Sequence, residues 1–132
     1  MSLQSIEPIS IENIQPLTEL MLELWPDCSF NEEYENCVRI LKSENETCFL
    51  VREGKNYVAF IQLAIRFDYV EGSTNPSIAY VEGIYVKPSF RRIGVGNRLI
   101  TCGKDWAAQK GYKQLVEIPP KLTTSFRDKV TT

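Results

Sequence analysis

The sequence of 132 residues contains no histidine. This absence excludes the usual Ser-His and Cys-His nucleophile arrangements, and it removes the side chain that most often binds metals in proteins. A general base in this protein must therefore be a carboxylate, a tyrosine or a chain of water molecules. We expect no metal site.

Paired cysteines and long apolar runs are lacking as well. The four cysteines lie at positions 28, 37, 48 and 102, without a paired spacing, which favours reduced, mostly buried thiols. The longest apolar runs have the length of a strand, and the first residues lack the basic start and apolar stretch of a signal peptide. These features predict a cytoplasmic protein with no membrane partner.

The net charge of −2 is small, but the charges are unevenly placed along the chain. Residues 1–46 hold ten acidic and two basic side chains, whereas residues 87–132 hold ten basic and three acidic ones. A fold that sets these ends on opposite sides of a cleft would attract a cation to one side and a polyanion to the other. The alternative is that the charges form solvated helix faces. We predict no nucleic-acid partner.

The order of apolar patterns predicts a single α+β domain. Ser29 with Glu32 has the form of a helix-capping box, and Pro26 ends the helix before it. The predicted strands are residues 3–9, 47–53, 57–69, 78–86 and 112–118, and the predicted helices start near residues 10, 29 and 95 and end near residues 24, 43 and 110. Residues 121–132 show almost no periodicity, and we expect no regular element there.

The most informative stretch is residues 86–99, VKPSFRRIGVGNRL. An apolar strand leads into a turn with two arginines and two closely spaced glycines, and a helix follows. A helix start presents unpaired backbone N–H groups and the positive end of its dipole, so it favours an anion. Glycines let that anion approach the backbone closely. The stretch predicts a phosphate-binding turn.

The segment Arg91-Arg-Ile-Gly94-Val-Gly96 resembles the acetyl-coenzyme A motif of the GNAT superfamily of N-acetyltransferases. The resemblance implies a GNAT fold over residues 1–115, with a mixed, mostly antiparallel central sheet flanked by helices. It also implies acetyl-CoA as co-substrate, with the pyrophosphate on the turn amides and the pantetheine arm along the preceding strand. The cofactor-binding residues implied are Ile84, Tyr85, Val86, Arg91, Arg92, Ile93, Gly94, Val95, Gly96 and Asn97.

Four separated segments are similar to bacterial aminoglycoside 6′-N-acetyltransferases: residues 24–27 (LWPD), 66–72 (RFDYVEG), 81–86 (VEGIYV) and 88–91 (PSFR). The resemblance implies a cationic amine substrate bound by Trp25, Asp27, Phe67, Tyr69 and Glu82. Glu82 is the implied catalytic base, acting directly or through water. A carboxylate within an apolar strand is costly to bury without a partner, which also favours a functional role for Glu82.

The resemblance stops near Leu115. Residues 116–132 form an atypical tail in which the family's usual last helix and strands are missing or altered, and we interpret it as a truncated or frameshifted C-terminus. A sheet without its last strands would leave an unpaired edge, which a homodimer would cover. Two alternatives to the aminoglycoside prediction remain open: a GNAT enzyme for another amine, such as a polyamine or a peptide, and a CoA-binding remnant without turnover.

Overall fold

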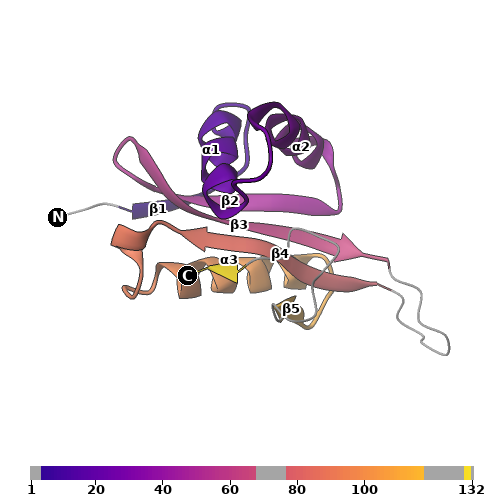
Figure 1. Ribbon diagram of the computed structural model, residues 1–132. Helices are drawn as coiled ribbons and strands as arrows, with labels where there is room; N and C mark the ends of the chain where they lie inside the picture. The colour runs from indigo at the N-terminus through magenta and orange to yellow at the C-terminus, as the bar shows by residue number, and fades with distance from the viewer. Residues whose placement is uncertain (1–3, 68–76, 118–129, 132) are drawn as a thin grey trace.

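A mixed sheet lies between helices on both of its faces in the computed structural model, which describes residues 4–67, 77–117 and 130–131 (Figure 1). Helices α1 and α2 cover one face, and α3 covers the other. The elements in chain order are β1 (Gln4–Pro8), α1 (Ile14–Leu24), α2 (Phe30–Lys42), β2 (Glu46–Glu53), β3 (Asn56–Arg66), β4 (Ile78–Val86), the 3₁₀ helix η1 (Pro88–Phe90), α3 (Val95–Gln109), β5 (Leu115–Glu117) and β6 (Val130–Thr131). This arrangement confirms the predicted α+β class.

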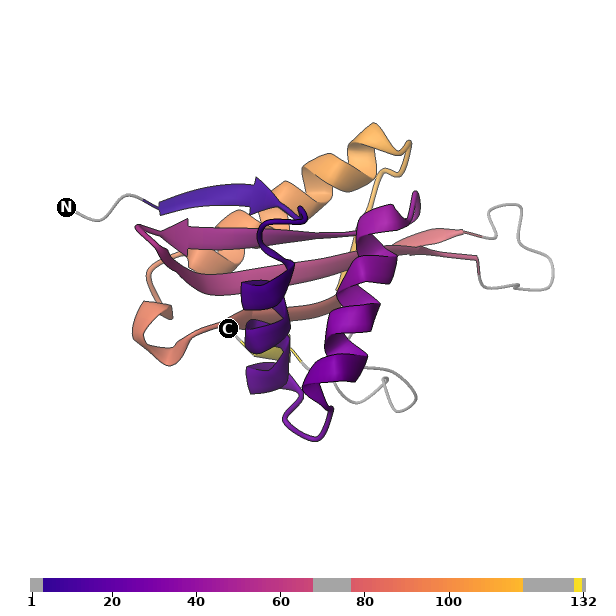
Figure 2. The same cartoon turned by 90° about the horizontal axis from the view of Figure 1, so that it is seen from above.

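The sheet is antiparallel from β1 to β4, with the strands side by side in chain order. The other edge of β4 is shared by two short parallel strands. β5 pairs with Ala79–Val81, and β6 pairs with Ile84 and Tyr85. Figure 2 shows the connection between α1 and α2 projecting past β4 on this same side of the sheet. The end of α1 and the C-terminal strand therefore both lie at the side of the sheet that β4 occupies.

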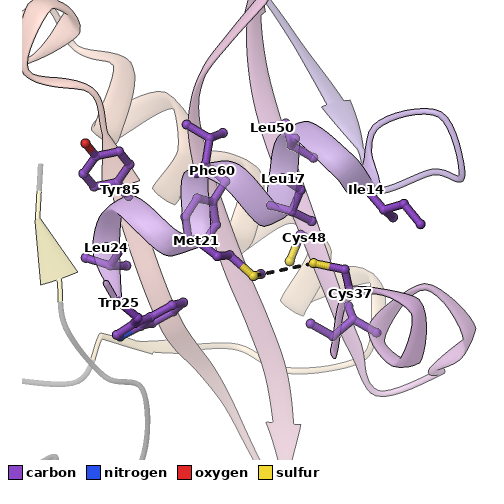
Figure 3. Packing of buried hydrophobic residues seen from close by; sticks show 12 residues of the cluster. Ile14, Leu17, Met21, Leu24, Trp25, Cys37, Cys48, Leu50, Phe60 and Tyr85 are labelled. Atoms are coloured by element: carbon purple, nitrogen blue, oxygen red, sulfur yellow. Dashed lines mark hydrogen bonds between the residues drawn. The ribbon is translucent and has the colours of Figure 1, made fainter. Parts of the chain in front are cut away.

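Helix α1 carries one apolar face onto the sheet, as the spacing of its apolar residues predicts. Leu17 and Met21 are fully buried above Leu50 of β2 and Phe60 of β3, in one hydrophobic cluster (Figure 3). Trp25 closes the row just beyond the helix, with 5% of its surface exposed and its ring 6.1 Å from that of Phe60. The cluster fixes the end of α1 over the middle of the sheet.

Helix α2 begins with the predicted capping box. The Ser29 hydroxyl accepts a hydrogen bond from the Glu32 backbone N–H, and the Glu32 carboxylate accepts one from the Ser29 N–H. Two N–H groups that a helix start leaves unpaired are thereby satisfied. The cap sets where the chain turns after Trp25, and hence how α2 lies beside α1.

The cysteines are free thiols, as the sequence predicts. Cys37 on α2 and Cys48 on β2 are fully buried in the cluster under α1, and the Cys37 thiol donates to the Met21 sulfur at 3.6 Å (Figure 3). Burial raises the pKa of the Cys37 thiol and raises that of Cys48 well above its usual value. Cys28 and Cys102 are half-buried.

Several features differ from the sequence prediction, among them the start of α1, which is at Ile14 rather than near residue 10. β3 ends at Arg66 rather than at residue 69, and β5 is confined to Leu115–Glu117 because Tyr112 is still engaged with the helix end, its N–H bonded to the carbonyl of Ala107. A further difference is β6, in a segment for which no element was predicted. Its two residues form a strand because their backbone pairs with β4, and such pairing leaves no periodic pattern in the sequence.

Candidate functional site

The glycine turn between β4 and α3 has the geometry of an anion site. Gly94 is the N-cap of α3 with φ of 88°, and no side chain caps the helix. Arg92 also lies in the left-handed region, with φ of 66°. Since Gly94 has no side chain to cap the helix, the first N–H groups of α3 are left for a ligand or for water.

A cavity of about 360 Å³ opens at this turn. Seven of the ten predicted cofactor-binding residues line it, namely Ile84, Val86, Arg91, Arg92, Gly94, Gly96 and Asn97. Ile100 and Glu117 complete the lining and were not predicted. Ile100 lies one helical turn beyond Gly96, so helix periodicity was a signal for it, whereas Glu117 reaches the cavity only because β5 pairs with β4.

The other three predicted cofactor residues point elsewhere. Val95 is buried in the core on the α3 face, and Ile93 is 62% exposed. Tyr85 faces the opposite side of the sheet, where its hydroxyl donates to the Glu23 carboxylate of α1 at 2.7 Å. Burial and this hydrogen bond raise the pKa of Tyr85 to about 12. Tyr85 can therefore meet a ligand of the β4 edge only through its backbone.

Arg91 is built into the turn. Its Nε donates to the Val86 carbonyl at 2.7 Å, and its guanidinium carbon lies 5.6 Å from the centre of the Tyr85 ring. These contacts fasten the turn to the end of β4. Arg91 thus supplies positive charge beside the cavity while its position is fixed by the strand.

Glu82 lies at a β-bulge. Gln62 of β3 is in register with Gly83, and Leu63 is in register with Val81, so Glu82 is the extra residue of β4. The shift explains why Val81 and Ile84, three residues apart, both pack in the cluster under α3. Bulges re-aim a side chain and are frequent beside active sites.

The Glu82 carboxylate is held by Arg66, the last residue of β3. Arg66 Nε donates to Oε2 at 3.0 Å, and Nη2 donates to Oε1 at 2.5 Å. The guanidinium also lies over the Tyr80 ring, 4.9 Å from its centre. Sequence reasoning identified Glu82 but missed Arg66, because the bulge that brings the two side chains together is invisible in the apolar run 80–86.

The predicted acceptor residues fall into two groups. Trp25 lies against Gly83, which follows Glu82 in the chain. This contact is on the side of the sheet that α1 and α2 cover. Asp27 is exposed in the turn between the two helices, and Phe67 is 64% exposed just beyond Arg66. Tyr69 lies outside the described residues. The structure therefore places Trp25 against the residue that follows Glu82 and leaves Asp27 and Phe67 on the surface.

The described part of the chain offers neither a cluster of side chains suited to a metal ion nor a helix long and apolar enough to cross a bilayer. Two features of the described residues are suited to a ligand: the turn before α3, with the geometry of an anion site, and the Glu82 carboxylate on β4. A model of the acetyltransferase (GNAT) family matches residues 10–123. The chain belongs to the GNAT family.

Similar proteins indicate which kind of GNAT enzyme the chain resembles. The chain is 36% identical over 106 residues to the aminoglycoside N(6′)-acetyltransferase type 1 of Serratia marcescens, a match that covers 79% of this chain and 72% of that protein. Its fold is similar to that of aminoglycoside N-acetyltransferase AAC(6′)-Iy in complex with CoA, with a TM-score of 0.83, 26% identity and coverage of 92% of this chain and 80% of that one.

The same AAC(6′)-Iy enzyme has been solved with the bisubstrate analogue CoA-S-monomethyl-acetylneamine. This structure matches with a TM-score of 0.82 and 26% identity, over 91% of this chain and 82% of that one. The GNAT fold and the resemblance to aminoglycoside 6′-N-acetyltransferases, both inferred from sequence motifs, are thereby confirmed.

Proposed function

We propose that this GNAT protein transfers the acetyl group of acetyl-CoA to a primary amine of a cationic small molecule, and specifically to the 6′-amine of an aminoglycoside. The observation that carries the proposal is the likeness to an aminoglycoside acetyltransferase holding a bisubstrate CoA–acetylneamine analogue. The name of the 36% identical Serratia relative supports the choice of the 6′ position.

The donor end of the reaction is assigned to the cavity at the start of α3. Backbone N–H groups after Gly94 and the guanidinium of Arg92 supply donors and positive charge for the pyrophosphate of CoA. The thioester end would then run along β4 toward Glu82. This direction is supported by the cavity lining, which includes Val86 and Ile84.

The acceptor end is assigned to the region of Glu82 and Trp25. The Glu82 carboxylate attracts an ammonium group, and the Trp25 ring supplies an apolar wall beside it. Glu82 accepts one proton of the ammonium group, directly or through water, and the neutral amine nitrogen then attacks the thioester carbon. A C–N bond forms, the C–S bond breaks, and the departing CoA thiolate takes up the second proton that the nitrogen loses, so that CoA leaves as a thiol.

Strand β6 bears directly on this proposal. Its pairing with Ile84 and Tyr85 uses the edge of β4 along which we expect the pantetheine arm to lie. The two cannot occupy one set of backbone groups together. We infer that acetyl-CoA binding displaces β6 from β4.

The decisive experiment measures CoA thiol release from acetyl-CoA with kanamycin as acceptor, and compares the protein with its Glu82→Gln variant. Loss of a general base typically costs about 100-fold or more in rate, so we expect E82Q to lower kcat by about that factor. Glu7→Gln is the matched control, since Glu7 is also paired with an arginine, Arg52, but lies on β1, at the other edge of the sheet.

The outcomes separate the proposal from its rivals. Release with kanamycin that exceeds release with spermidine or a free peptide N-terminus supports the aminoglycoside assignment; the reverse order moves the function to another amine. Titration of acetyl-CoA without any release supports a CoA-binding remnant. If E82Q retains full activity, Glu82 is not the base.

A further inference from the structure

The contact between Arg66 and Glu82 is more specific than a general attraction of opposite charges. Both carboxylate oxygens are engaged by separate nitrogens of one guanidinium, at 3.0 and 2.5 Å. The side chains of Arg66 and Glu82 are only 19% and 16% exposed. A two-point contact of this kind fixes the plane of the carboxylate, which a single hydrogen bond leaves free to rotate.

The bulge explains why such a contact is needed. Glu82 is the extra residue of β4, so the ladder with β3 does not set its direction. Arg66 lies on β3, diagonally across from Glu82 on β4. Its guanidinium is itself held over the Tyr80 ring, 4.9 Å from the ring centre. The side chain that fixes Glu82 is therefore fixed in turn.

The geometry still leaves Glu82 able to work. An ionised carboxylate has about four lone-pair sites, and the guanidinium occupies one on each oxygen. The remaining sites can accept a hydrogen bond from an amine or from a water molecule that carries the amine proton. Arg66 thereby restricts the directions from which such a donor can approach Glu82.

We propose that Arg66 is a positioning residue for acetyl transfer, which acts through Glu82 by holding its carboxylate in the plane that receives the acceptor amine. This inference rests on the proposed function. It adds a residue whose role is defined by a contact to another side chain rather than to the substrate. The group that Arg66 binds is the carboxylate of Glu82.

The test combines Arg66→Gln, Arg66→Lys and Glu82→Gln in a double-mutant cycle. Since misplacement of a reacting group by about 1 Å can cost about 100-fold, we expect R66Q to lower kcat by about ten- to a hundredfold and to leave the KM for acetyl-CoA unchanged. R66K restores the charge but not the two-point contact, so it recovers only part of kcat. In the E82Q protein, R66Q has no further effect beyond about twofold.

The control is Arg52→Gln, which removes the arginine of the ion pair with Glu7 at the other edge of the sheet. Thermal unfolding of each variant identifies any loss of folded protein, and R66K carries the test if R66Q does not fold. If R66Q behaves like R52Q, or if the effects of R66Q and E82Q multiply, the positioning role is overturned while the proposed function stands.

A second readout, calorimetric titration with kanamycin, separates the two proposals. If the protein binds kanamycin without acetylating it, and R66Q changes the affinity only when Glu82 is present, the proposed function fails, and Arg66 holds Glu82 for binding of the amine rather than for its acetylation. If the protein neither acetylates nor binds kanamycin, both are overturned.

Discussion

At the scale of single residues, the contact between Gly83 and Trp25 links the sheet to the end of α1. A Cβ at position 83 would lie 2.6 Å from Cη2 and 2.8 Å from Cζ2 of the indole ring, closer than carbon atoms approach one another. Trp25 is 5% exposed and packs on Phe60, so the ring has little room to retreat. Only glycine leaves the indole in place beside Glu82.

We therefore predict that Gly83→Ala destabilises the protein and impairs acceptor binding. Overpacking of a core typically costs about 1–3 kcal/mol, and displacement of Trp25 should raise the KM for kanamycin more than that for acetyl-CoA. Denaturant unfolding and steady-state kinetics measure the two effects. Trp25→Phe is the matched background, because its smaller ring should relieve much of the clash; an equal cost of G83A in both backgrounds would contradict this explanation.

At the scale of elements, the donor path that we propose along β4 would make acetyl-CoA and β6 compete for one edge of that strand. A proline lacks the backbone N–H, so Val130→Pro should free the edge at Ile84 and Tyr85. Backbone hydrogen bonds contribute about 1 kcal/mol each, and we expect acetyl-CoA to bind a few-fold to about tenfold more tightly. Calorimetric titration checks this, with Val130→Ala as the control that keeps the N–H. Unchanged affinity in V130P would show that β6 and the donor do not compete.

The elements also show how far the sequence alone leads. Helices were predictable because apolar spacing and caps are local signals: Ser29 and Glu32 form the expected capping box, and the α1 face from Ile14 to Leu24 is buried as its spacing predicts. The glycine turn before α3 was predictable for the same reason. Its charges, glycines and helix start lie within one short segment.

The parts that escaped prediction depend on contacts between distant segments. Arg66 meets Glu82 only through the register of β3 and β4 and the bulge between them. Glu117 enters the cavity through the parallel pairing of β5, and β6 exists only as a partner of β4. A sequence records the residues of such contacts but not the register that joins them.

At the scale of the whole molecule, one cluster of polar contacts ties the N-terminal half to the C-terminal half. Glu23 on α1 accepts a hydrogen bond from Tyr85 on β4 at 2.7 Å and one from Lys87 at 3.1 Å. Tyr85 is 6% exposed, and its pKa is raised to about 12. The native state thus retains the phenol proton to a higher pH than the unfolded chain, whose tyrosines titrate near about 10.

The free energy of unfolding should therefore depend on pH through Tyr85. The contribution of the protonated phenol is complete below about pH 10 and is lost as the pH rises toward about 12, with a slope of up to about 1.4 kcal/mol per pH unit. Urea unfolding at several pH values in this window measures the slope. Tyr85→Phe should show a shallower slope over the same window, and an identical slope in both proteins would refute the assignment.

The burial of the sulfur atoms has a practical consequence for the measurement of turnover. Two of the four thiols, Cys37 and Cys48, are sealed in the core with raised pKa values, so neither presents thiolate readily to a disulfide reagent. A colorimetric reagent added during catalysis will therefore report the sulfur of released CoA against a background from the half-buried Cys28 and Cys102 alone. The same reagent also measures how fast the core opens, because Cys37 and Cys48 will react only as fast as α1 and α2 separate from the sheet.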